Sequence, residues 1–268
     1  MTAWYLMPPV WKLPVQGIEW KDWKTQKKSV IHPKSPDWIP IDKVSKNALH
    51  AIIAAEDTRF YSHGGLDYTE IYQSLKINIK EQKIIRGGST ITQQVVKIAF
   101  LTPQKSLIRK IREALGALAL EQVLTKDEIL GWYINSVEFG DGIHGIHNAA
   151  EHYFGTKPNR LTIQQAVNLA LVLPGPNVRS KSLKRRQLSD LGRKRYFQIL
   201  KRMYEMGFIT KTLKKYALAT GDFGRPIITE GSRNQQVQVK ISQRPVEPER
   251  VLFDQDLDLP SLNLIIEN

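Results

Sequence analysis

The chain has 268 residues, of which 41% are apolar; this is enough for one or two domains with packed cores and excludes disorder over the whole length. It contains no cysteine, which excludes disulfides, thiol nucleophiles, zinc–thiolate sites and iron–sulfur clusters. Lysine and arginine number 39 against 26 aspartates and glutamates, a net charge of +13, and this excess favours a phosphate-bearing partner such as nucleic acid, anionic lipid or a substrate.

The N-terminal segment, residues 1–35, is rich in tryptophan, proline and lysine and is expected to form an irregular stem. Its first residues are apolar, but Pro8 and Pro9 interrupt them and they lack a basic segment, so they do not form a signal peptide. We interpret them as the trailing end of an anchor that lies outside this chain. No run of about 18 apolar residues occurs, and no transmembrane helix is predicted.

Residues 41–221 have the apolar spacing and the end signals of helices. The expected helices cover about 42–57, 67–82, a stretch opened by a capping box at 90–93, 105–124, stretches opened by capping boxes at 125–128 and 162–165, 187–206 and 210–219. Beyond 221 the periodicity fades, and only a weak strand-like piece at 236–241 stands out. The sequence therefore predicts one mostly α domain with irregular ends.

The first candidate site is Glu56, which ends the first expected helix. Ala48, Ile52 and Glu56 share one helix face at a spacing of four residues. That face is small and apolar, so a carboxylate at its end loses solvation and its pKa rises, as a general base requires. The alternative is a side chain that turns outward at a fraying helix end.

The second candidate site is the stretch 86–97. Gly87 and Gly88, followed by Ser89 and Thr90, leave bare backbone N–H groups at a helix N-terminus, which is a ready anion site. Lys97 follows on the same face of that helix. The pattern suits a phosphate or pyrophosphate, although it lacks the order of a P-loop; the alternative is a plain capped helix after a flexible turn.

The third candidate site lies inside the long helix at 105–124. Arg109 and Glu113 are four residues apart and can pair. A surface salt bridge is the alternative. Gly116 argues against it, because a glycine costs about 1 kcal/mol in a helix interior and here is expected to clear space beside Glu113.

Two further stretches are chemically distinctive. Glycines at 140, 142 and 145 predict a tight loop against a ligand or another helix. The nearby His144 and His147 lack the order of a zinc site. Residues 179–202 hold ten lysines and arginines against Asp190 alone, a charge that fits an anionic membrane surface or, on charge alone, nucleic acid.

Five of these stretches, in this order, resemble the motifs of glycosyltransferase family 51, the peptidoglycan glycosyltransferases. The family's E-D-x-x-F-x-x-H-x-G, G-G-S-T-I-T-Q-Q, R-K-x-x-E, K-x-E-I-L-x-x-Y-L-N and A-A-x-x-Y-F-G match residues 56–65, 87–94, 109–113, 126–135 (with Ile134 for the usual leucine) and 149–155. Any one motif is modest support, whereas five in order, within a resemblance that covers about 36–178, are very specific.

The resemblance implies a mostly α, lysozyme-like fold with a head lobe and a smaller membrane-facing jaw lobe. It implies polymerisation of lipid II into glycan strands with inversion at the donor anomeric carbon and release of undecaprenyl pyrophosphate. Glu56 is then the general base and Glu113 the second catalytic carboxylate, beside the donor. Substrate-binding positions carried over from the motifs are Asp57, Phe60, His63, Gly88, Ser89, Thr90, Gln93, Gln94, Lys97, Arg109, Lys110 and Asn135.

The catalytic domain is expected to span 36–220, with a C-terminal extension of unknown role at 221–268. No tightly bound cofactor is implied; Mg²⁺ or Mn²⁺ near Glu113 would bind with the substrate pyrophosphate, outside any protein-only cage. The partners implied are lipid II, the growing glycan chain and an anionic membrane surface, with cell-wall synthases and division proteins as candidates and no nucleic acid. The expected location is the bacterial cell envelope, at the periplasmic side of the inner membrane.

The chain lacks S-x-x-K, S-D-N and K-T-G, so no transpeptidase site is predicted and the monofunctional form is expected. Two other functions stay open. A lysozyme-like or lytic glycosidase would share a catalytic glutamate but would not need the anion site at 87–97. A basic, helical nucleic-acid-binding protein would explain the charge but not the ordered motifs.

Overall fold

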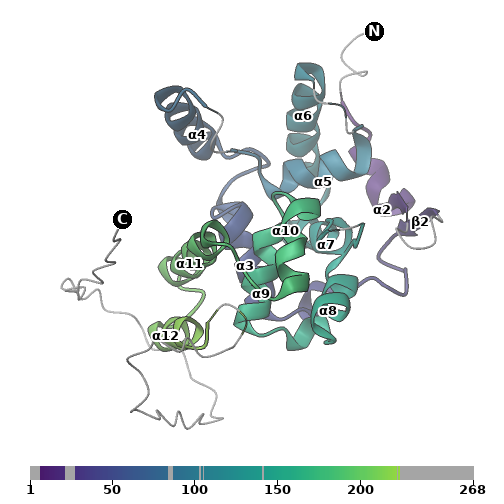
Figure 1. The fold of residues 1–268 in the computed structure, drawn as a ribbon. Coiled ribbons are helices and arrows are strands. Elements are labelled where there is room, and N and C mark those ends of the chain that lie inside the picture. Colours follow the sequence, from purple (N-terminus) through teal and green to yellow (C-terminus); the bar gives the residue numbers. More distant parts are fainter. Residues whose placement is uncertain are drawn as a thin grey trace, which may run out of the picture. The chain divides into compact units, whose positions relative to one another are not determined.

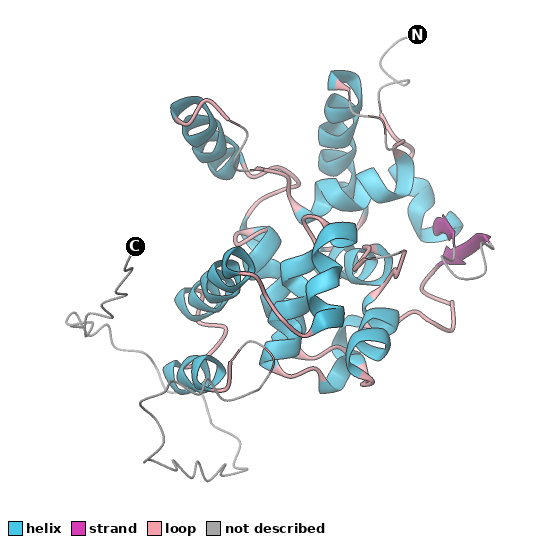
Figure 2. Cartoon of the chain, viewed as in Figure 1, coloured by secondary structure: helices cyan, strands magenta, loops and turns pink. Residues whose placement is uncertain are grey.

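The computed structural model describes residues 7–21, 28–83, 87–102, 104, 106–140, 142–221 and 223. The strand-like piece expected at 236–241 and nearly all of the extension at 221–268 lie outside the described residues. Helices dominate the described part (Figure 2), and its strands are β1 (Ile18–Lys21) and β2 (Lys28–Ile31), which pair antiparallel with Ile18 opposite Ile31. No helix in the described part is long and apolar enough to cross a membrane.

The helices lie close to where the sequence predicts them. They are α2 (Leu13–Gln16), α3 (Lys46–Glu56), α4 (Tyr68–Lys80), α5 (Ile91–Phe100), α6 (Leu107–Val123), α7 (Lys126–Ser136), α8 (Ile146–Phe154), α9 (Ile163–Val172), α10 (Pro176–Arg185), α11 (Asp190–Glu205) and α12 (Lys211–Ala219), with 3-10 turns η1 (Val10–Lys12), η2 (Ile41–Lys43), η3 (Phe60–Ser62) and η4 (Pro158–Arg160). This helical fold confirms the predicted class.

The predicted helix starts agree best with the observed ones where a side chain caps the first turn. All three capping boxes form, at Thr90, Thr125 and Thr162, each with its reciprocal bond from the residue three positions on. The start predicted at residue 42 is wrong, because residues 41–43 form a separate 3-10 turn and α3 begins at Lys46.

Three helices were not predicted. The four-residue α2 lies in the expected irregular stem, and the other two, α8 and α10, lie between glycines or prolines. α8 begins after Gly145 with no side-chain cap and ends at the left-handed Gly155, so its sequence reads as a glycine-rich loop. α10 begins with Pro176 directly after Pro174 and Gly175, a combination that reads as a turn.

α9 forms the centre of the core. Nine of its ten residues are buried, all but Gln165. It packs against α3, α10 and α11, and α3 also contacts α11 (Figure 1). A second group joins α5 to α6 and α7. The small residues Ala48 and Ala51 of α3 are fully covered, which lets this helix approach α9 closely.

The N-terminal segment is not an irregular stem in its described part, which corrects that expectation. Val10, Leu13, Ile18 and Ile31 are buried in the main core cluster. Segment 7–21 carries η1, α2 and β1, and η1 contacts α6. The apolar residues that supply this packing lie in short turns and a short strand. They are too few to form a periodic pattern, so the sequence did not predict their burial.

Gly116 serves this packing rather than the space beside Glu113. A Cβ at Gly116 would lie 2.6 Å from Cγ1 of Val96 on α5 and 3.0 Å from Cγ of Pro8. The absent side chain therefore lets α6 approach both α5 and the N-terminal segment. The prediction that Gly116 clears space for the carboxylate is wrong.

The predicted tight loop at 140–145 lies against helices. Gly140 has φ +117°, and a Cβ there would lie 2.2 Å from the Cβ of Ser180 on α10. Gly145 has φ +79°, and its Cβ would lie 2.8 Å from the carbonyl oxygen of Asn135 at the end of α7. Of the two roles predicted for this loop, helix packing is the one that the structure shows.

Candidate active site

A cavity of about 610 Å³ opens at the C-terminal end of α3. One wall is the end of α3 with the loop after it, and another is the stretch 87–90 before α5. α11 and the start of α10 close it with Arg195, Arg202 and Arg179. We call this cavity the Glu56 cleft, because Glu56 is the carboxylate that α3 presents to it.

Glu56 is the last residue of α3, and its helix face is buried at Ala48 and Ile52 as predicted. Burial raises the pKa of Glu56, while a hydrogen bond from Gln94 and the charges of Arg195, Lys97 and Arg179 oppose the rise. The negative end of the helix dipole acts in the same direction as burial. Glu56 therefore faces the cleft as a carboxylate with raised proton affinity, and the outward-turned alternative is excluded.

Gln94 and Tyr133 fix the carboxylate of Glu56. Nε2 of Gln94 donates to Oε2 of Glu56 at 2.8 Å, and the hydroxyl of Tyr133 donates to Oε1 of Gln94 at 3.3 Å. Burial raises the pKa of Tyr133 well above its ordinary value, so the phenol keeps its proton. Because the phenol donates to the amide oxygen, the amide N–H group is the one that faces Glu56.

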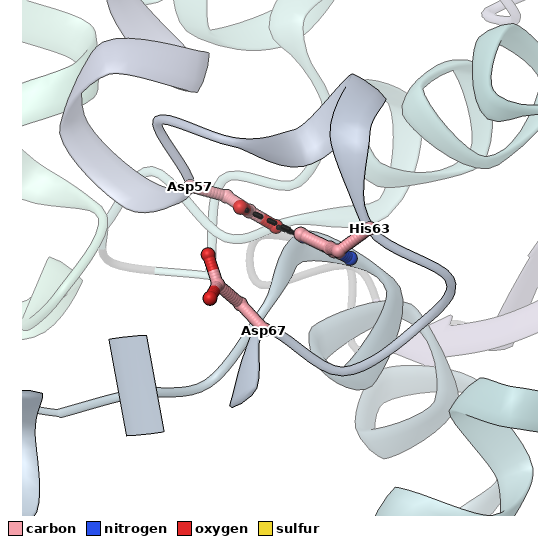
Figure 3. A group of neighbouring side chains, drawn as sticks. All are labelled: Asp57, His63 and Asp67. Atoms are coloured by element: carbon pink, nitrogen blue, oxygen red, sulfur yellow. Dashed lines mark hydrogen bonds and ion pairs between the residues drawn. The ribbon is translucent and has the colours of Figure 1, made fainter. Parts of the chain in front are cut away.

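Asp57 joins the loop after α3 to the first turn of α5. Its two oxygens accept from Nε2 of His63, each at 3.0 Å (Figure 3), and its Oδ2 also accepts from the backbone N–H of Ile91 at 3.0 Å. The bonded tautomer of His63 carries its proton on Nε2, while its buried Nδ1 has no hydrogen-bond partner among the described residues. Asp57 thus holds Glu56 at a fixed place relative to the stretch 87–90.

Glu113 is the second predicted carboxylate and lies in a different setting. It is 3% exposed on α6, forms an ion pair with Lys110 and lies 3.7 Å from a guanidinium nitrogen of Arg109. Nζ of Lys110 also donates to the hydroxyl of Ser89 at 2.8 Å. These contacts join the third motif to the glycine–serine stretch of the second.

Lys97 connects the two carboxylates electrostatically. Burial lowers the pKa of Lys97, and the charges of Glu113 and Glu56 both oppose that shift. Arg109 and Lys110 lower it further. A cluster of three cations around one carboxylate has positive charge left over, which suits an incoming phosphate.

Comparison with known proteins shows the family to which this chain belongs. The family model described as transglycosylase matches residues 24–204. The chain belongs to the transglycosylase family. It is a peptidoglycan glycosyltransferase, an enzyme that polymerises glycan chains in cell-wall synthesis, as the five motifs predict.

Curated relatives named biosynthetic peptidoglycan transglycosylase agree. The chain is 40% identical over 157 residues to the protein of Herminiimonas arsenicoxydans, and the matched region covers 56% of this chain and 68% of that protein. It is 40% identical over 157 residues to the Dechloromonas aromatica protein, with 59% and 67% covered. It is 44% identical over 139 residues to the Chromobacterium violaceum protein, with 52% and 61% covered.

Within this transglycosylase, the Glu56 cleft is lined by five of the positions carried over from the motifs: Glu56, Asp57, Gly88, Ser89 and Thr90. Four more, Lys97, Arg109, Lys110 and Glu113, form the neighbouring cationic cluster. Gln94 touches Glu56 itself. The structure therefore brings together the two positions predicted to be catalytic and the second and third motifs.

Four other carried-over residues support the fold of the transglycosylase. Phe60 is fully buried beneath the ammonium of Lys126, and Gln93 completes the capping box of α5. His63 is bonded to Asp57. The amide of Asn135 exchanges hydrogen bonds with the backbone of Ile39, each at 2.9 Å, which anchors the stretch before α3 to α7. The structure does not place these side chains in the cleft.

Three arginines of the cleft were missed as site residues. The Glu56 cleft is lined by Arg179, Arg195 and Arg202. The charge pattern of the sequence predicts only a basic surface at these positions. A signal for two of them exists, because Arg195 and Arg202 are seven residues apart, two turns along one face of α11. Arg202 also donates to the carbonyl oxygen of Ala54 at 3.2 Å, which ties α11 to the end of α3.

Neither the cluster of Asp57, His63 and Asp67 nor the carboxylate of Glu113 fits a resident metal ion. Asp57, His63 and Asp67 are close enough to ligate one. However, the oxygens of Asp57 and Asp67 already accept hydrogen bonds from His63, the Ile91 backbone and Arg59. Glu113 offers one carboxylate, and it is engaged by Lys110 and Arg109. Among the described residues, these carboxylates therefore leave no open set of oxygen ligands for a resident metal ion.

Proposed function

We propose that the Glu56 cleft carries out the transfer step of lipid II polymerisation, with Glu56 as the general base. The acceptor's 4-hydroxyl gives its proton to Glu56 as its oxygen attacks the donor anomeric carbon. The bond from that carbon to the pyrophosphate oxygen breaks, its electron pair leaves with undecaprenyl pyrophosphate, and the configuration inverts. The observation that carries the proposal is the raised pKa of a carboxylate whose sole direct partner in the described part is a neutral amide.

The cationic cluster is the proposed place of the leaving group. A departing pyrophosphate gains negative charge, and preorganised cations stabilise it most where charge develops. Lys110 lies beside the N-terminus of α5, where its Nζ donates to the hydroxyl of Ser89, and Lys97 lies in the last turn of the same helix, where the charges of Glu113 and Glu56 act on it. Glu113 holds Lys110 and Arg109 in place, which we propose as the part it plays in catalysis.

The arginines of α11 are proposed to bind the acceptor. Arg195 and Arg202 line the same cavity as Glu56, on the side of α11. An acceptor whose hydroxyl lies at Glu56 carries its own pyrophosphate on the far side of its disaccharide. Two guanidiniums matched to that phosphate would hold the acceptor in register for attack.

The enzyme acts in the cell envelope, and we propose that it works at the outer side of the inner membrane. α4 exposes a set of large apolar side chains: Tyr68, Ile71, Tyr72, Leu75 and Ile79. Together with the basic segment 179–202, these supply two weak membrane signals, and two signals give more stable attachment than one. Co-sedimentation with vesicles should therefore require anionic lipid and weaken as salt is raised.

The divalent cation and the protein partners expected from the resemblance remain predictions. A cation carried by the substrate pyrophosphate would make activity fall on addition of a chelator. Activity that survives chelation would assign charge neutralisation to Lys97 and Lys110 alone. Cell-wall synthases and division proteins stay candidate partners.

The test of the proposed function is incubation with labelled lipid II, followed by gel separation of the products. Glycan strands that a muramidase digests are expected. Release of fragments from intact peptidoglycan without polymerisation would instead support a lytic glycosidase. Retention of the chain on nucleic acid with no turnover of lipid II would favour the nucleic-acid-binding alternative.

A further inference from the structure

A second cavity of about 580 Å³ is lined by residues of α10, the loop after it, α11 and the end of α9. It shares Arg179, Arg195 and Gln198 with the Glu56 cleft, so the two cavities meet at these side chains. We call it the α10–α11 groove. The reaction proposed above uses Arg195 at this junction but leaves the rest of the groove without an occupant.

The groove combines an apolar floor with a basic rim. Leu171 and Leu188 are each 3% exposed and form the floor. Lys181, Arg185 and Lys194 line the rim, and none of the described residues that line the groove is acidic. Such a lining suits a short, extended ligand with apolar side groups and carboxylates.

The junction between the two cavities is short of negative charge. Burial lowers the pKa of the Arg195 guanidinium, and repulsion from the guanidinium of Arg179 lowers it further, while the charge of Glu56 opposes these shifts. Arg179 is held by the carbonyl oxygen of Leu171 at 3.3 Å, and neither arginine has an ion pair among the described residues. An anion seated between them would relieve this repulsion.

We propose that the α10–α11 groove binds the anionic stem peptide of the acceptor. This inference rests on the proposed function, since it takes the acceptor hydroxyl to lie at Glu56. The peptide of a disaccharide-peptide precursor is attached to the sugar next to the one that bears that hydroxyl. A peptide site must therefore open about one sugar ring away from Glu56, and the groove opens where Arg179 and Arg195 line both cavities.

A lipid surface explains the groove less well. Headgroups are contacted by protruding side chains, whereas Arg179 and Arg195 are partly buried and the floor is recessed. Arg186 and Lys201 of the same basic segment do not line the groove and are exposed, so they remain for the membrane. The structure thus divides the basic segment into a peptide-facing and a membrane-facing part.

The test compares lipid II that carries its complete stem peptide with lipid II whose peptide is trimmed to one residue, in detergent. We expect the wild-type enzyme to prefer the complete substrate about tenfold in kcat/KM, about 1.4 kcal/mol. The double variant Lys181→Ala/Arg185→Ala should lose this preference and treat both substrates as the wild type treats the trimmed one. The matched variant Lys201→Ala/Lys211→Ala removes the same charge outside the groove and should keep the preference.

Equal discrimination by the groove variant and the wild type would overturn the inference. The inference would also be overturned if the groove variant lost binding to anionic vesicles but kept its substrate preference, because that result would assign the groove to lipid. Calorimetric titration with the soluble disaccharide-peptide, with and without its peptide, separates the two levels of the argument. If the wild type polymerises neither substrate, the proposed function fails. Binding that requires the peptide and that the groove variant loses would still support a peptide site in the groove. Binding that is the same with and without the peptide would refute the peptide site.

Discussion

The two carboxylates of this transglycosylase lie in opposite surroundings. Glu56 ends a helix whose face is apolar, and its direct partner is the neutral amide of Gln94. Glu113 lies in the middle of a helix and is held by two cations, Lys110 and Arg109. Both are glutamates within family motifs, so residue type does not distinguish them, whereas their partners do.

This difference supports the separate tasks that we propose for the two residues. A carboxylate that is poorly solvated and unpaired by cations gains proton affinity and suits a base. A carboxylate that is held between cations keeps its charge and serves to orient those cations. Changes to these surroundings should therefore alter the chemistry at Glu56 and the positioning of cations at Glu113.

The largest effect is expected from Glu56→Gln. Loss of the general base should lower polymerisation by about 10²–10⁴-fold, because the amide of the variant cannot accept the proton of the acceptor hydroxyl. Gel analysis of labelled lipid II measures this. Turnover within threefold of the wild type would remove Glu56 from the role of base.

The same variant should be at least as stable as the wild type at pH 7. The folded-state pKa of Glu56 is raised, so ionised Glu56 costs folding free energy above the unfolded pKa of about 4.3. That cost is complete above the folded pKa and disappears as the pH falls below both values. Thermal unfolding of the two proteins should therefore differ at neutral pH and converge in acid; a Glu56→Gln protein that is less stable at neutral pH would contradict the assignment.

Glu113→Gln should lower activity by about a hundredfold through lost positioning of Lys110 and Arg109. It should also cost about 1–2 kcal/mol of stability, because the variant leaves two cations near each other without their shared anion. Glu121→Gln is the matched control. Glu121 lies on the same helix as Glu113 but does not line the cleft, and it is paired with Lys126 of α7, so its loss should reduce stability and spare turnover. Equal activity losses in both variants would show that Glu113 acts through stability alone.

The parts of this site that the sequence predicts are those whose cause is local. The capping box at Thr90 depends on residues three positions apart and forms as predicted. The apolar face under Glu56 is likewise a matter of helical spacing. Where neighbours in sequence are neighbours in space, periodicity and end signals are sufficient.

The parts that the sequence does not predict depend on distant contacts. Asn135 belongs to a family motif, but its amide is used by Ile39, which lies 96 residues away. Arg195 and Arg202 read as surface charge until α11 is packed against α3. The N-terminal residues Val10 and Leu13 show no periodicity, and they are buried in a segment whose η1 packs against α6 and whose β1 packs against α5.

Lys97→Ala is expected to weaken binding of a phosphoglycolipid mimic of the donor about tenfold or more. The reason is that a charge-assisted hydrogen bond to phosphate is lost from a partly buried ammonium. Calorimetry measures the affinity. Lys201→Ala, an exposed lysine of α11 paired with Glu205, should leave it unchanged. An affinity that does not respond to Lys97→Ala would place the anion site elsewhere.

The smallest effect, and the sharpest test of the surroundings of Glu56, is expected from Tyr133→Phe. The phenol of Tyr133 holds the amide oxygen of Gln94, so that the amide N–H group faces Glu56. Without it the amide can rotate and offer its oxygen, which favours protonated Glu56 and raises its pKa further.

Since the base must be ionised, activity falls as the pH drops through the pKa of Glu56, and in the variant that decline should begin at a higher pH. The groups facing Glu56 from other elements are Lys97 on α5, Arg179 on α10 and Arg195 on α11, and the substitution changes none of them. The shift should be about one pH unit or less, with turnover at alkaline pH nearly preserved. Tyr153→Phe removes a comparable hydroxyl bond, to the carbonyl oxygen of Phe139 at 3.0 Å, and should leave the profile in place. A uniform loss of activity at every pH in the Tyr133 variant would mean that the phenol supports packing and has no influence on the base.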